Sequence, residues 1–87
     1  MKFLLGEVRQ VGIEVISTVN QSFVIAAADY SIENRESFDV ISAGTATIED
    51  YKILTLFAAA SVGKFQVVFT YRIAAEILKA VVYIDVA

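Results

Sequence analysis

The sequence predicts one all-β domain, a sandwich or a small barrel, over residues 1–87. Apolar and polar residues alternate with a period of two along most of the chain, and the helical period near 3.6 is scarce. Turn-forming segments recur about every 10 residues, which is typical of sandwiches and barrels built from short strands. Because 57% of the residues are hydrophobic and only 20% are charged, the chain can build a folded core.

Two strands are expected in the first third. Val11, Ile13 and Val15 alternate with polar residues or glycine, which predicts a half-buried strand. A polar turn should follow over residues 17–22; it contains an N-glycosylation pattern at Asn20, but no export signal precedes it.

The second of these strands spans residues 23–32 and loses its clean alternation at residues 26–28, which predicts a bulge or a stretch buried on both faces. A charged reversal is expected over residues 33–36.

The middle of the chain predicts two short strand pieces, around residues 38–40 and 46–48. Residues 42–44 (Ser-Ala-Gly) lie between them as a hairpin turn, because glycine adopts positive φ without steric cost. Glu49 and Asp50 mark the next reversal.

Residues 51–57 then predict a central strand, with Ile53 and Phe57 on one side and Leu54 and Leu56 on the other. A short helix over residues 54–60 is the alternative, since leucine and alanine favour helices.

The last third gives the clearest pattern. Residues 65–73 and 78–86 each place apolar side chains at every second position along one face, and residues 74–76 form a short link between them. A link this short cannot carry a parallel crossover, so an antiparallel hairpin is expected, and we expect it to be the centre of stability. The chain has no proline, which often blunts edge strands. Edge protection should therefore come from Glu14, Lys79 and Asp85, or from a partner subunit.

The missing residue types exclude several kinds of chemistry. Without cysteine or histidine there is no disulfide, no thiolate or imidazole catalyst, and no zinc cluster. The acidic pairs Glu33/Glu36 and Glu49/Asp50 lack the spacing of a calcium loop and are expected to be solvated turn charges. We therefore expect no enzyme, no catalytic residue, no metal and no cofactor.

Net charge and hydropathy argue against two classes of partner, nucleic acids and membranes. The net charge is −3, and the basic residues are scattered, which argues against nucleic acid. They are Lys2, Arg9, Arg35, Lys52, Lys64, Arg72 and Lys79. The uncharged stretch of residues 53–63 is too short to span a bilayer, and residues 1–5 are too short for a secretory signal, so neither membrane nor export is expected.

Aromatic residues and glycines have mainly structural interpretations. Tyr30, Tyr51 and Tyr83 would stack on a sugar only if they lined an exposed strand face, and packing is the simpler reading. Four isolated glycines match no phosphate-binding motif. They are Gly6, Gly12, Gly44 and Gly63. A small-molecule ligand is thus not expected.

The segment Ser61-Val62-Gly63-Lys64-Phe65 resembles the entry into the F strand of immunoglobulin-like domains. Serine and phenylalanine stand where that motif has aspartate and tyrosine, so only its packing half is retained. The resemblance implies an immunoglobulin-like antiparallel β-sandwich of about seven strands, without the disulfide and buried tryptophan of antibody domains.

Longer segments resemble small immunoglobulin-like proteins of tailed phages and Firmicutes prophages. The likeness rests on residues 5–9, 15–18, 23–32 and above all 63–79, although the apolar segment 37–48 replaces a charged, glycine-containing hairpin. It implies a non-enzymatic structural or interaction domain of a head, tail or baseplate. Its partners would be copies of itself or other virion proteins, and it would occupy the bacterial cytoplasm during assembly and then the virion. The alternative is a ligand-binding module such as a carbohydrate-recognition sandwich.

Overall fold

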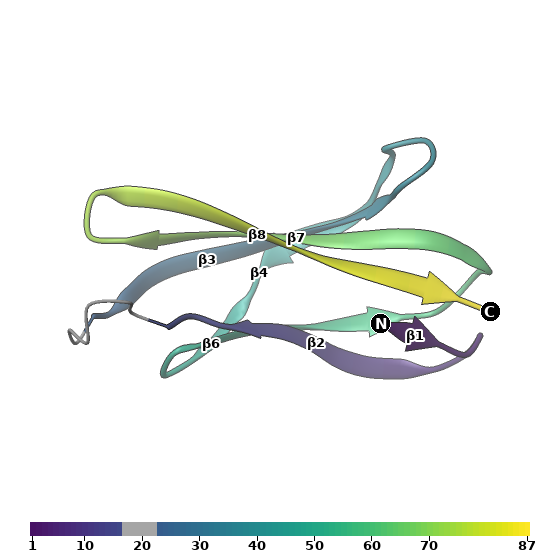
Figure 1. Ribbon diagram of the computed structural model, residues 1–87, viewed down its shortest axis with the longest axis horizontal. Coiled ribbons are helices and arrows are strands. Elements are labelled where there is room, and N and C mark those ends of the chain that lie inside the picture. Colours follow the sequence, from purple (N-terminus) through teal and green to yellow (C-terminus); the bar gives the residue numbers. More distant parts are fainter. Residues whose placement is uncertain (17–22) are drawn as a thin grey trace.

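The computed structural model describes residues 1–16 and 23–87, and all regular elements within them are β-strands (Figure 1). The expected turn over residues 17–22 lies outside the described residues. The strands are β1 (Lys2–Phe3), β2 (Val8–Glu14), β3 (Ile25–Asn34), β4 (Val40–Thr45), β5 (Thr47–Glu49), β6 (Lys52–Ala58), β7 (Gly63–Ile73) and β8 (Glu76–Val86). They form a sheet of order β1-β8-β7-β3-β4 and a second of order β2-β6-β5.

This arrangement confirms the predicted immunoglobulin-like sandwich. In that fold the C, F and G strands share one sheet, which variable-type domains extend beyond C, and the B, E and D strands form the other. Here β3, β7 and β8 are C, F and G, β4 extends their sheet, and β2, β6 and β5 form the opposite one. The neighbouring strands pair antiparallel except that β1 runs parallel to β8.

The core lies between the two sheets and follows the period-two alternation. On β7 the residues Phe65, Val67 and Phe69 face inward and are almost fully buried, whereas their neighbours are more exposed. Opposite them lie Ile53 and Phe57 of β6, also fully buried. No charged or polar residue among those described is buried, so apolar burial, at about 1.5–3 kcal/mol for each large side chain, stabilises the fold.

Several expectations for single strands are confirmed. The β7–β8 hairpin pairs antiparallel along its full length, with Ala74 and Ala75 as its turn. A register shift at Ile25–Ala27 is the expected irregularity in β3. β6 is a strand, so the helical alternative over residues 54–60 is wrong. Its outer face is not covered, however, because Leu56 remains 61% exposed.

The expected turn at residues 42–44 is wrong. These residues lie inside β4, where Ser42, Ala43 and Gly44 pair with β3. Gly44 lies opposite Tyr30, whose ring would come within 3.4 Å of a Cβ at that position. Gly44 thus lies within a paired strand, beside an aromatic ring, instead of reversing the chain. Ala46, which is buried, marks the crossing from β4 in one sheet to β5 in the other.

The expected reversal at residues 33–36 begins later than predicted, because β3 continues to Asn34. The Asn34 side-chain oxygen then accepts hydrogen bonds from the backbone N–H groups of Glu36 and Ser37, which holds the turn. Figure 1 shows this β3–β4 turn projecting beyond the body of the sandwich at the upper right.

Candidate functional site

The acidic residues do not converge on a common point. Glu33 lies on the outer face of β3 and accepts hydrogen bonds from Ser31 (3.0 Å) and Gln66 (2.8 Å). Glu36 lies in the β3–β4 turn, and Glu49 and Asp50 lie exposed at the β5–β6 turn. Within residues 1–16 and 23–87, no group of three or more acidic side chains is placed to hold a metal ion.

The three tyrosines occupy three different surfaces. Tyr30 is half-buried on the inner face of β3, where it packs against the core, and its hydroxyl lies 3.5 Å from that of Ser42. Tyr51 lies at the β5–β6 turn against Phe23, with 4.7 Å between ring centroids. Tyr83 is exposed on the outer face of β8. The rings therefore do not form the exposed row that a stacking platform for sugars would need.

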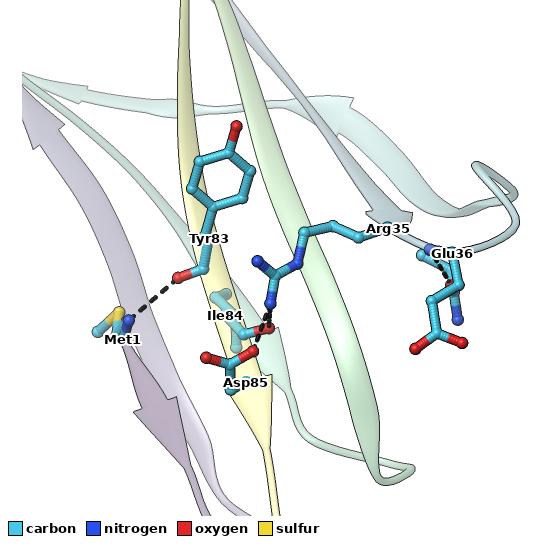
Figure 2. Close-up of polar contacts among 7 residues, drawn as sticks. Met1, Arg35, Glu36, Tyr83, Ile84 and Asp85 are labelled. Atoms are coloured by element: carbon cyan, nitrogen blue, oxygen red, sulfur yellow. Dashed lines mark hydrogen bonds and ion pairs between the residues drawn. The ribbon is translucent and has the colours of Figure 1, made fainter.

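Arg35 makes the largest polar cluster, and Figure 2 shows it reaching across β7 to β8. Its guanidinium donates to the carbonyl oxygen of Ile84 (3.2 Å) and to the Asp85 carboxylate, and its Cζ lies 5.1 Å from the centroid of the Tyr83 ring. On the other side of β8 the amino group of Met1 donates to the Tyr83 carbonyl (3.2 Å). These contacts fasten the β3–β4 turn and the amino terminus to β8, which is a structural role.

The segment that resembles an F-strand entry keeps the packing that the resemblance implies. Phe65 is buried at the start of β7, and its ring centroid lies 5.8 Å from that of Phe57 in the opposite sheet. The two rings are tilted by 58° to each other, and an aromatic contact at this separation stabilises the packing of one sheet on the other. Gly63, at a φ of +148°, allows the chain to enter the strand beside the Phe65 ring.

An apolar groove is the most distinctive surface feature. It has a volume of about 250 Å³ and opens where the two sheets part beside β4 and β6. Aliphatic and aromatic side chains from both sheets line it, with two serine hydroxyls and no charge. The lining residues are Ile32, Ile41, Ser42, Leu56, Phe57, Ala58, Ala60, Ser61 and Phe65.

Open strand edges border the groove on both sides. β5 pairs only with the first three residues of β6. On the side of β6 that faces away from β2, the backbone of Thr55–Ala58 therefore has no neighbouring strand in the described part of the chain. β4 is the last strand of its sheet, and all six of its residues are exposed. Residues 40–48 and 53–63 contain no charged residue.

The two edges of the larger sheet differ in protection. Lys79 and Asp85, two of the charges expected to guard the edges, lie on β8, and β1 covers the end of that strand. Glu14 lies on β2 in the other sheet. On β4 the one interruption is a bulge at Ile41, whose side chain turns into the groove. The exposed edge of β4 is thus the least protected one.

Sequence reasoning missed this groove because it placed a turn at residues 42–44, inside the strand that borders it. The uncharged run of residues 53–63 was the available signal, and the sequence could not place it beside β4. No helix among the described residues is long and apolar enough to cross a membrane. No protein-family model, curated protein or solved structure matches this chain.

Proposed function

We propose that this protein is a non-enzymatic structural domain of a phage or prophage particle. It acts through contacts with copies of itself or with other virion proteins in the head, tail or baseplate. The resemblance of residues 63–79 to small phage proteins supplies the biological setting. The uncharged groove between two open strand edges supplies the physical basis, and this is the observation that carries the proposal.

Open edges and exposed apolar side chains favour protein contacts over chemistry. An unpaired edge presents backbone N–H and C=O groups that a further strand can satisfy, and large exposed apolar patches mark protein interaction sites. The groove offers two serine hydroxyls and no carboxylate, so it lacks the acid and base of a hydrolytic site. The carbohydrate-binding alternative has less support, because the tyrosines share no face.

Particle composition tests the proposal. The host strain is induced, particles are purified by density gradient, and peptides of this chain are sought by quantitative mass spectrometry. We expect the chain to co-purify with intact particles at a fixed ratio to the major virion proteins. If complete particles lack the chain while it accumulates in the particle-free lysate, the proposed function is wrong. A host protein of similar size and abundance controls for carry-over.

A further inference from the structure

We propose that two copies of this chain pair through antiparallel β4 strands, which joins their larger sheets and closes the groove. The inference rests on the proposed function and names the partner at that surface as a second copy. A two-fold axis beside the strand makes such a contact self-complementary, because each copy offers the same groups that it requires.

The backbone of β4 is oriented for this pairing. The N–H of Ala46 donates to the carbonyl of Ala28 on β3 (3.0 Å), and the direction of backbone groups alternates along a strand. Ser42 and Gly44 therefore turn their N–H and C=O groups toward β3, whereas Ala43 and Thr45 turn theirs to the open edge. With Gly44 on the axis, Ala43 of each copy lies opposite Thr45 of the other, and the outward groups pair.

Charge favours a second copy as the occupant. The protein carries a net charge of −3, so self-association through its charged surfaces would bring like charges together. The strip formed by residues 40–48 and 53–63 has no charge, and two copies can meet there without repulsion. A charged partner would find no complementary group on it.

Exposed apolar side chains lie beside the β4 edge and would be buried by a second copy. Large apolar side chains near the edge are among the exposed residues, with Val40 at 60%, Ile41 at 57% and Leu56 at 61% exposure.

Phe38 adds a large exposed apolar side chain next to β4. Phe38 lies two residues before the start of β4, has a φ of +62°, and is 70% exposed. The positive φ belongs to the β3–β4 turn, which the N–H of Phe38 closes by donating to the carbonyl of Asn34 (2.8 Å). The ring is left exposed there, and its burial against a second copy would stabilise the dimer.

Solution mass tests the inference, measured by size-exclusion chromatography with light scattering and by sedimentation velocity. We expect the wild-type chain to have a mass of about 19 kDa, that of a two-fold dimer. Ala43→Pro should give the monomer mass with an unchanged circular dichroism spectrum, because the lost N–H faces the open edge and not β3. Val81→Pro is the matched control, since the backbone N–H of Val81, like the backbone groups of Tyr83 and Asp85, points away from β7. It should leave the mass unchanged.

A second variant keeps the test decisive if Ala43→Pro fails to fold. Phe38→Asn puts a residue that tolerates positive φ at a position where φ is positive. It should keep the thermal midpoint of the monomer and weaken the dimer at least tenfold in Kd. The inference is wrong if the wild-type chain is still a monomer at a concentration of about 1 mM, because stable dimers have Kd values far below that concentration. It is also wrong if the wild-type chain forms dimers that neither variant weakens. If the chain is a monomer in solution but is found in particles, the β4 pairing is wrong and the proposed function stands. If the chain forms the β4 dimer but is absent from particles, the proposed function is wrong and the pairing stands.

Discussion

Replacing Gly12 by alanine should destabilise the fold through a contact between two strands. Gly12 lies on β2 directly opposite Leu54 of β6. A Cβ at residue 12 would lie 2.2 Å from Cδ2 of Leu54 and 2.8 Å from the carbonyl oxygen of Ile53. The leucine side chain can rotate away, but the backbone oxygen can yield only if β2 and β6 move apart.

The cost follows from that forced shift. Overpacking a well-fitted site costs about 1–3 kcal/mol, and we take about 2 kcal/mol here. The unfolding entropy of 87 residues is about 0.18 kcal/mol per K, so the thermal midpoint should fall by about 11 °C. Differential scanning calorimetry and urea unfolding, both at a concentration where the oligomeric state is known, measure the change.

Gly44→Ala is the matched control, because its Cβ would meet the Tyr30 ring at 3.4 Å, an ordinary contact distance. Its φ is not in the positive region, so alanine should stabilise the fold by about 0.5 kcal/mol through the unfolded chain. If Gly12→Ala unfolds at or above the wild-type temperature, the close approach of β2 and β6 does not require glycine and the reasoning is refuted.

Two further predictions concern turns. Arg35→Ala should cost about 2 kcal/mol, because the side chain is only 23% exposed and loses a backbone acceptor, an ion pair and a ring contact. Asp85→Asn should cost at most about 0.5 kcal/mol, because Asp85 is 52% exposed; equal losses in urea unfolding would contradict this. Ala74→Gly should raise the thermal midpoint by about 3 °C, because Ala74 has a φ of +53°. Ala75→Gly, outside the positive region, should lower it, and the same sign for both would count against strain at Ala74.

Strands with one continuous apolar face were predictable because their pattern is local. The β7–β8 hairpin needs only that one face of residues 65–73 and 78–86 be apolar and that the link be short. The register shift in β3 was also predictable, because the alternation of apolar and polar residues is lost at the three alanines of residues 26–28. For β4, local preference indicated a turn at residues 42–44, but these residues pair with Tyr30, Ser31 and Ile32 of the neighbouring strand β3, and that pairing overrode it.

The amino-acid sequence by itself determined that the chain folds as an all-β sandwich held by apolar packing, with no cysteine or histidine chemistry. Those properties depend on composition and on a period of two, which neighbouring residues carry. Only the tertiary structure decided which strand edges lie open beside the groove, because β5 ends after pairing with three residues of β6 and β4 has no outer neighbour among the described strands. The groove joins residues such as Ile41 and Leu56, which meet only once both sheets have formed, and so it could not be located from the order of residues alone.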